Sequence, residues 1–385
     1  MGETTYAIMR SLPEVLQDAA VKAHLARKRR GLKHLQTPTA IILYVTNKCN
    51  LRCGHCFYWD SLNTKTPELT IEQVDKLVAS LAHPVSLSLT GGEPFMRKDL
   101  AEMVQCFMAP RKAKEVAVAT SGYYTRDTVE FCRQFLARYA DTPLSVQISL
   151  DGLRDTHDAI RGIPTSFDRA LATMDNLVEL AGQHSALSVA CGVAIQKRNL
   201  GEISELIDLL AARKVEIRIN LIRGETAGTF GVTLENSSHF DPKDGNSIAL
   251  DVEEMHALHA LLTAKNELHG FWSKRHQRSY EIGMEVIEHR KKVIDCWAGT
   301  IDGVIYPNGD VAFCELTRVV GNLHDYDFDL KKLWHTAQAV AMRDNVTRCF
   351  CTHGCNISTN LLMSDPAIVK EAVLGTSGAR RAGTT

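Results

Sequence analysis

The sequence predicts an α/β fold, in which a partial (β/α)6 TIM-like barrel is followed by a small unit made of a β-hairpin and a helix. From residue 40 onward, short β-branched runs alternate six times with longer segments of helical period, as in parallel sheets. Several of these runs alternate apolar and polar residues. A packed parallel sheet is apolar on both faces, so this pattern indicates a cavity. A Pro-Asn-Gly turn at 307–309 predicts the hairpin.

The elements of the barrel are expected in the following order. Strands are predicted at 40–46, 85–90, 115–120, 144–150, 187–195 and 215–222, with helices near 71–82, 98–109, 125–139, 166–182 and 200–213. Each helix segment repeats apolar residues with a period near 3.6, as a helix that covers a sheet requires. Thr70 followed by Gln73 predicts a capping box at the start of the first helix. Two more helices, near 251–267 and 272–290, lead toward the hairpin.

The alternating strands predict which residues line the cavity. If their apolar side chains face the helices, the polar ones point inward, where a ligand enters from the carboxyl ends of the strands. The expected substrate contacts are Gln147, Arg218, Asn220, Arg223 and, from the segment "HDAIRG", Arg161. The arginines favour an anionic group on the substrate, although ion pairs with carboxylates of the barrel would give the same pattern.

Composition narrows the class of protein. The 385 residues carry a net charge of -1 and are 45% hydrophobic, so we expect a full core and no binding to nucleic acid or to an anionic membrane. No apolar run is long enough to span a bilayer and no signal peptide is evident, which favours a cytoplasmic protein. Eight of the eleven cysteines fall into two groups, a pattern that indicates metal ligation rather than disulfides.

The first cysteine group directly follows the first predicted strand. Cys49, Cys53 and Cys56 have the spacing C-x3-C-x2-C at the mouth of the cavity. Three thiolates suit a [4Fe–4S] cluster that keeps one iron open to another ligand. A zinc site is the alternative, but it needs a fourth ligand, and His55 is awkwardly placed because it adjoins Cys56.

At these residues the sequence resembles the radical S-adenosylmethionine (SAM) enzymes, whose signature is C-x3-C-x-aromatic-C. Cys49, Cys53 and Cys56 match the cysteines, and His55 stands at the aromatic position. The resemblance implies that the three cysteines hold a [4Fe–4S] cluster and that SAM chelates its open iron.

The segment "TGGEP" resembles a second element of this family. The resemblance implies that Gly91, Gly92 and Glu93 contact the amino group of SAM; glycines permit close approach of the backbone, and a carboxylate accepts from an ammonium. "SLDG" resembles the ribose-binding element, although a helix-capping aspartate is the alternative there. The further cofactor contacts implied by the resemblance are Tyr58, Ser121, Ser149, Asp151 and Asn199.

The second cysteine group flanks the predicted hairpin and resembles the SPASM and Twitch extensions of radical SAM enzymes. Its members are Cys296, Cys314, Cys349, Cys351 and Cys355. The resemblance implies one auxiliary [4Fe–4S] cluster on Cys296, Cys314 and two of the other three. A four-thiolate zinc site is the alternative. The remaining cysteines, Cys106, Cys132 and Cys191, are expected in the core.

The chain is accordingly divided into five parts. They are an N-terminal helical extension (1–39), the radical SAM partial barrel (40–225), a lid loop with linking helices (226–295), the SPASM/Twitch-type domain (296–360) and a partly disordered tail (361–385).

The resemblance implies reductive cleavage of SAM to a 5′-deoxyadenosyl radical, which abstracts a hydrogen from a peptide or a small organic substrate. With an auxiliary cluster to accept an electron, the expected outcome is net oxidation or cross-linking; redox-neutral epimerisation or dehydration is the alternative reaction. An electron donor such as flavodoxin or ferredoxin is also implied. A non-catalytic iron–sulfur protein for electron transfer or sensing is a different class, and it leaves "TGGEP" and the polar barrel unexplained.

Overall fold

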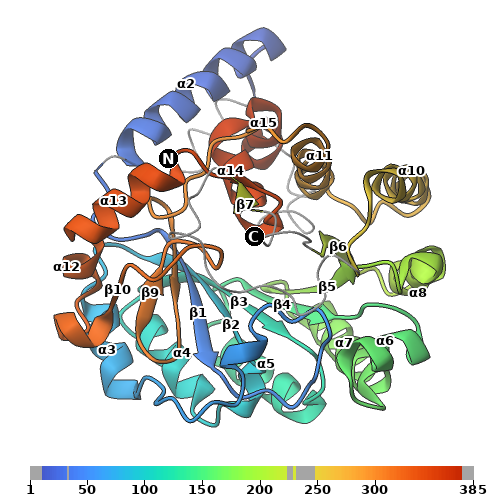
Figure 1. The fold of residues 1–385 in the computed structure, drawn as a ribbon, viewed down its shortest axis with the longest axis horizontal. Helices are drawn as coiled ribbons and strands as arrows, with labels where there is room; N and C mark the ends of the chain where they lie inside the picture. The colour runs from blue at the N-terminus through green and yellow to red at the C-terminus, as the bar shows by residue number, and fades with distance from the viewer. Residues whose placement is uncertain (1–10, 33, 223–228, 231–247, 375–385) are drawn as a thin grey trace.

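The computed structural model describes residues 11–32, 34–222, 229–230 and 248–374. Its centre is a nine-stranded sheet in the order β10-β9-β8-β1-β2-β3-β4-β5-β6, in which β1 to β6 are parallel. Figure 1 shows these strands fanning around one side of the molecule with helices outside them. The six parallel strands are β1 (Ala40–Thr46), β2 (Val85–Gly91), β3 (Ala113–Thr120), β4 (Leu144–Ser149), β5 (Leu187–Ile195) and β6 (Glu216–Leu221).

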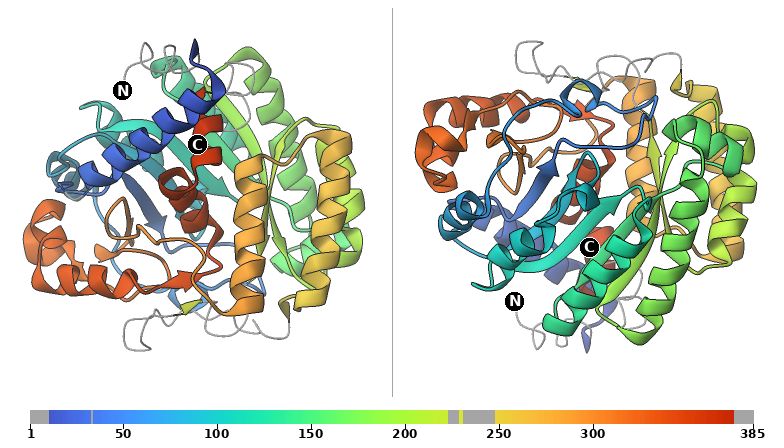
Figure 2. Two further views of the ribbon diagram at one scale, coloured as in Figure 1. Left: turned by 90° about the horizontal axis from the view of Figure 1, so that it is seen from above. Right: turned by 90° about the horizontal axis from the view of Figure 1, so that it is seen from below.

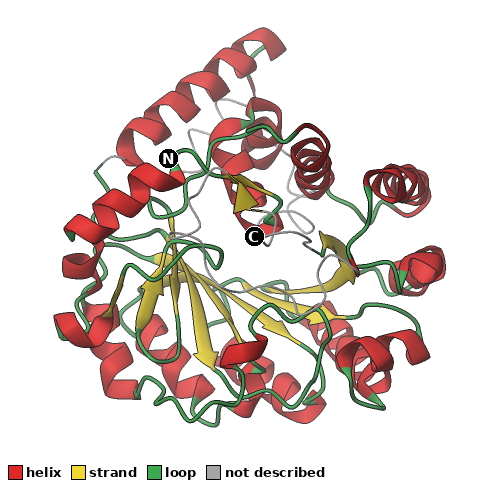
Figure 3. Cartoon of the chain, in the orientation of Figure 1, coloured by secondary structure: helices red, strands yellow, loops and turns green. Residues whose placement is uncertain are grey.

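The helices between these strands cover the outer face of the sheet, as their periodicity predicts (Figure 3). The predicted capping box is present, because the backbone N–H of Gln73 donates to Oγ1 of Thr70 and its side chain accepts from the Thr70 N–H. The helices are α3 (Ile71–Ala79), α4 (Leu100–Met108), α5 (Thr125–Arg138), α6 (Arg154–Arg161), α7 (Ser166–Gln183) and α8 (Ile203–Ala211). Helix α6 was not predicted, and it proves to be important for the site.

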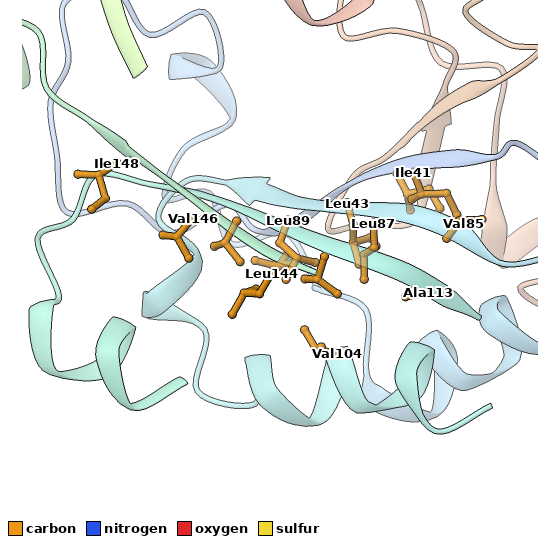
Figure 4. Packing of buried hydrophobic residues seen from close by; sticks show 14 of the residues in the cluster. Ile41, Leu43, Val85, Leu87, Leu89, Val104, Ala113, Leu144, Val146 and Ile148 are labelled. Atoms are coloured by element: carbon orange, nitrogen blue, oxygen red, sulfur yellow. The ribbon is translucent and has the colours of Figure 1, made fainter. Parts of the chain in front are cut away.

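The core lies between the sheet and these helices. In β2 the side chains of Val85, Leu87 and Leu89 are buried, while the serines between them are only half-buried. Figure 4 shows these residues packed with Leu144 and Val146 toward the helical layer. The alternation therefore orients the polar residues to the inside of the barrel, as predicted. The three cysteines that were assigned to the core are all buried.

The C-terminal unit joins the sheet of the barrel. Its predicted hairpin is formed by β8 (Asp302–Ile305) and β9 (Asp310–Ala312), with β10 (Gly321–Asn322) beside it. Strand β8 pairs in parallel with β1, Ile42 opposite Val304. The sequence predicted the hairpin but not this pairing, so the sheet is continuous across the predicted domain boundary.

Helices of the C-terminal half close the open side of the barrel. In Figure 1, α14 lies in the space that the strands surround, and Figure 2 shows α2 crossing beside the C-terminal helices. Helix α2 contacts α15 through Val21, Leu25 and Val369. The helices of the C-terminal half are α10 (Val252–His269), α11 (Lys274–His289), α12 (Leu330–Trp334), α13 (Ala337–Val346), α14 (Gly354–Ser364) and α15 (Pro366–Leu374), and α2 (Glu14–Leu32) comes from the N-terminal part of the chain.

The lid loop expected before the linking helices, like Arg223, lies outside the described residues except for β7 (Thr229–Phe230), which pairs antiparallel with β11 (Phe350–Cys351). Residues 361–364 and 366–374, which were assigned to the tail, belong to α14 and α15. In the part of the chain that the structure describes, no helix is both long and apolar enough to span a membrane.

Candidate active site

The first cysteine group lies on the loop that follows β1, at the carboxyl ends of the parallel strands. Hydrogen bonds of its backbone groups hold this loop in place. The N–H of Cys49 donates to Asn63 Oδ1 at 3.1 Å, and the Asn63 side chain donates back to the Cys49 carbonyl at 3.0 Å. The N–H groups of Gly92 and Glu93 donate to the carbonyls of Thr46 and Lys48, both at 2.8 Å.

The two glycines of "TGGEP" are required by this contact. Gly91 has a φ of 131°, and a Cβ added to it would lie 2.4 Å from the carbonyl oxygen of Thr46. A Cβ added to Gly92 would lie 2.2 Å from the carbonyl oxygen of Lys48 and 3.1 Å from Cβ of Cys49. Real Cβ atoms do not approach a carbonyl so closely, so any larger residue would displace the cysteine loop.

The three thiols lie close to one another, with Cys49 buried and Cys53 and Cys56 half-buried. Burial raises the pKa of Cys49 to about 12 and that of Cys56 to about 11, and in both cases a neighbouring cysteine adds to the rise. Burial also raises the pKa of Cys53. A positively charged iron centre would reverse this effect, because it stabilises the thiolates.

The three thiols have the chemistry of a cluster site. They come from one short loop and are near enough to affect one another's pKa. In a four-iron cube each thiolate binds a different iron, so the sulfurs need not converge on one point. Cys49, Cys53 and Cys56 would hold the cluster that the sequence implies.

Arg161 connects the cysteine loop to the barrel. Its guanidinium lies 2.7 Å from Oδ2 of Asp151, which is fully buried, and Nη1 donates to Sγ of Cys53 at 3.6 Å. Its carbonyl accepts from the N–H of Arg52 at 2.9 Å. Arg161 was predicted to contact substrate, but the structure places it behind the loop. There it is an internal ion-pair partner and a positioning residue.

Glu93 is also bound within the protein. Its buried carboxylate accepts from the N–H of Phe95, the hydroxyl of Thr120, and both the N–H and the hydroxyl of Ser121, at 2.5 to 3.2 Å. A carboxylate offers about four acceptor positions, and these contacts fill them. Glu93 and Ser121 are thus bound to each other next to the cysteine loop, and their contacts to SAM stay a prediction.

Other predicted cofactor contacts are likewise engaged inside the protein. The side chain of Asn199 donates to the carbonyls of Asp151 and Ala194 at 2.5 and 2.8 Å and is fully buried. Asp151 accepts from the Ala194 N–H at 2.8 Å, so neither reading of it, ribose ligand or helix cap, describes its contacts. Ser149, at the end of β4, is half-buried.

Tyr58 lies in an aromatic cluster against which Cys56 packs. Its ring stacks on Tyr306 with centroids 6.0 Å apart and lies 4.9 Å from the ring of Tyr44. Phe57, rather than Tyr58, faces the cavity described next. Three aromatic residues follow Cys56, namely Phe57, Tyr58 and Trp59, and no local pattern indicates which of them points inward.

A cavity of about 250 Å3 lies between the barrel and the C-terminal unit. From the barrel it is lined by Gln147 and Asn220, and from the cysteine loop by His55 and Phe57. From the C-terminal unit it is lined by Glu315, Thr352, His353, Gly354 and Cys355. Ile219 and Leu221, which were expected to face the helices, also reach it, because β6 is an edge strand of the sheet.

The predicted substrate contacts on β6 divide into two kinds. Asn220 lines the cavity, whereas Arg218 pairs with Glu216 at 3.0 Å and donates to Gln147 Oε1 at 3.2 Å. Burial raises the pKa of Glu216, but a hydrogen bond from His276 and the charge of Arg218 lower it to about 2. Arg218 is therefore held by an internal carboxylate, which was the alternative interpretation of this arginine.

Four members of the second cysteine group gather on the other side of the cavity. The thiols of Cys296, Cys314, Cys349 and Cys351 are close enough to raise one another's pKa. Cys314 and Cys349 are buried, and Cys355 is exposed.

Three residues of the site were missed by the sequence analysis. Tyr44 donates to Oε1 of Glu315 at 2.6 Å, and Oε2 of Glu315 lies 2.6 Å from Nε2 of His353. These contacts link β1 to the turn that carries Cys314 and to the segment that follows Cys351. The only local signal was position, since Glu315 adjoins Cys314 and His353 stands between Cys351 and Cys355.

Comparison with known families agrees with this arrangement. Residues 43–210 match the model of the Radical SAM superfamily, and residues 296–356 match that of an iron–sulfur cluster-binding domain, SPASM. The cofactors expected from the sequence are confirmed in kind. They are SAM, the [4Fe–4S] cluster that binds it, and auxiliary iron–sulfur ligation in the C-terminal domain.

Individual relatives cover part of the chain. The Fe-coproporphyrin III synthase of Methanosarcina barkeri is 32% identical over 179 residues, or 46% of this chain and 41% of that protein. The PqqA peptide cyclase of Rhizobium meliloti is 27% identical over 205 residues, 51% of this chain and 50% of that protein. The chain thus matches about half the length of these curated relatives, or less.

The solved structure of Streptococcus suis SuiB bound to precursor peptide SuiA has the same fold. The superposition covers 85% of this chain and 71% of the SuiB chain, with a TM-score of 0.55 at 16% sequence identity. The predicted partial barrel with a C-terminal cluster-binding domain is confirmed. The chain belongs to the radical SAM superfamily and carries a SPASM-type iron–sulfur domain.

Proposed function

We propose that this chain modifies a peptide by abstracting a hydrogen atom from it, and that the reaction is a net oxidation or a cross-linking. One observation carries the proposal: a single cavity is lined both by the Cys49–Cys56 loop and by the segment that holds the auxiliary cysteines. Bound at the first site, a reduced cluster and SAM supply a 5′-deoxyadenosyl radical. A substrate in this cavity would lie between the source of the radical and an acceptor for the remaining electron.

The residues of the chain position the reactants and exclude water. Gln147 and Asn220 offer amide donors and acceptors that suit a peptide backbone. Phe57, Ile219 and Leu221 give the same cavity an apolar wall for a side chain. Behind these residues, Arg161 and Glu93 hold the cysteine loop and its neighbour in place, which fixes the distance between reactants.

A peptide is favoured over a larger ring system by the size of the cavity. The described residues enclose about 250 Å3, which is below the range of roughly 300–1,000 Å3 usual for sites that engulf a whole drug-sized ligand. One side chain of a longer molecule fits this space better than a tetrapyrrole does. The names of two comparison proteins, PqqA peptide cyclase and SuiB bound to precursor peptide SuiA, support the same class.

The test is anaerobic cleavage of SAM. The full chain is reconstituted with iron and sulfide, reduced with dithionite, and assayed for 5′-deoxyadenosine. We expect product from the wild-type chain and at least 100-fold less from Cys53→Ala. The matched control is Cys106→Ala, a cysteine on α4 outside both groups, which should retain activity.

An electron-transfer or sensor protein gives a different result. It would bind iron and accept an electron but would release no 5′-deoxyadenosine. Equal product from wild type and Cys53→Ala would also overturn the proposal, because the product would then not depend on the first cysteine site.

A further inference from the structure

The second cysteine group offers more thiols than one cluster needs. Five cysteines are available, and a [4Fe–4S] cluster usually takes four. The spacing C-x-C-x3-C at 349–355 does not indicate which of its three members are ligands. The structure distinguishes them by burial and by the surface that each thiol faces.

Four of the thiols form one set. Cys314 interacts electrostatically with Cys296 and Cys351, and Cys349 interacts with all three others and hydrogen bonds to Cys351. Two of the sulfurs also receive backbone N–H groups: Leu316 donates to Sγ of Cys314 and His353 to Sγ of Cys351, both at 3.4 Å. Donors aimed at sulfur favour thiolates and tune iron–sulfur clusters.

Cys355 differs from the other four thiols in its exposure. It is exposed, and it lines the substrate cavity together with Gln147 and Asn220 of the barrel. The preceding residue, Gly354, approaches the barrel closely, since a Cβ on it would lie 3.5 Å from Oδ1 of Asn220.

The local backbone explains the separation. Cys351 ends the short strand β11, and α14 begins at Gly354. Residues four apart on one helix share a face. Cys351 precedes the helix, so the helical repeat does not place its side chain beside that of Cys355.

We propose that the auxiliary cluster is ligated by Cys296, Cys314, Cys349 and Cys351, and that Cys355 is a wall residue of the substrate cavity. The assignment deepens the proposed function and rests on it. Four protein ligands leave no iron open to the substrate. The cluster would then exchange an electron with the substrate without bonding to it.

The first test isolates the auxiliary cluster. In the full chain carrying Cys49→Ala, Cys53→Ala and Cys56→Ala, reconstitution should load about four irons, the content of a single cube. Adding Cys355→Ala should leave the iron content and the EPR spectrum of the reduced protein unchanged. Adding Cys351→Ala instead should lower the iron content or change the spectrum. Iron lost with Cys355→Ala and retained with Cys351→Ala would overturn the assignment, as would a background that loads no iron.

The second test needs no substitution. The iron-loaded wild-type chain is treated briefly with iodoacetamide under anaerobic conditions, and its cysteines are mapped by mass spectrometry. Cys355 should be alkylated while the four proposed ligands are protected until a chelator removes the iron. Protection of Cys355 that ends only with chelation would contradict the assignment. Neither readout depends on SAM cleavage, so a chain with this ligand set that releases no 5′-deoxyadenosine would refute the proposed function alone.

Discussion

The ion pair between Arg161 and Asp151 gives the sharpest prediction about stability. Asp151 is fully buried, and the guanidinium lies 2.7 Å from its carboxylate. In Arg161→Met the stem of the side chain remains, but the buried carboxylate loses its cation. Removal of one partner of a buried pair costs about 3–5 kcal/mol, and we expect that loss in the free energy of unfolding of the reduced, iron-free chain in urea.

The chain supplies a matched control. Arg213 and Asp175 are separated by the same 2.7 Å, but the aspartate side chain is 51% exposed. Arg213→Met should therefore cost at most about 1 kcal/mol. Adding Asp151→Asn to Arg161→Met should restore part of the loss, because the charge is removed and an amide oxygen can still accept from the Ala194 N–H. Equal costs for Arg161→Met and Arg213→Met would refute the role assigned to burial here.

Three further predictions follow from the same contacts. Gly92→Ala places a Cβ 2.2 Å from the carbonyl oxygen of Lys48. It should lower the free energy of unfolding by about 1–3 kcal/mol and the iron content of the first site by half or more. Normal iron loading would contradict the steric explanation. Tyr44→Phe removes the buried donor to Glu315 and should cost about 1–3 kcal/mol in urea unfolding, whereas an unchanged midpoint would show that this bond is not needed. Burial and, after it, the charge of Arg161 lower the pKa of His157 to about 4. In the unfolded chain the pKa is near 6.5, so the unfolded state binds a proton first as the pH falls. The free energy of unfolding should therefore be unaffected by this residue above pH 6.5 and fall by about 1.4 kcal/mol per pH unit from there down to pH 4. His157→Gln should flatten that slope in urea unfolding measured from pH 7.5 to 5. The same slope in wild type and variant would show that His157 does not cause this pH dependence.

The parts of the fold predicted from sequence are those with local causes. All six parallel strands were expected within about two residues of their observed bounds. Apolar residues repeat with a different period in strands and in helices, so the sequence of each segment indicates its own secondary structure. The capping box at Thr70 and the turn at 307–309 are equally local. The pairing of β8 with β1 joins segments about 260 residues apart, and no local pattern indicates such a partner.

The same distinction applies to the site. The cysteine spacing and the two glycines could be predicted, because a short loop and a close backbone contact determine them. The partners of Asp151, Arg161 and Arg218 could not be predicted, because a polar residue on an inward-facing strand can pair with a ligand or with another side chain. Cys355 shows a further limit, since its role depends on where α14 begins.

The most direct measurement is an anaerobic crystal structure with SAM, with iron located by anomalous scattering. The account predicts one iron cluster at Cys49, Cys53 and Cys56, a second at the four proposed auxiliary ligands, and the 5′ carbon of SAM facing the cavity between Gln147 and His353. SAM bound elsewhere, or a cavity that does not lie between the two iron positions, would contradict the central claim that this cavity is the active site.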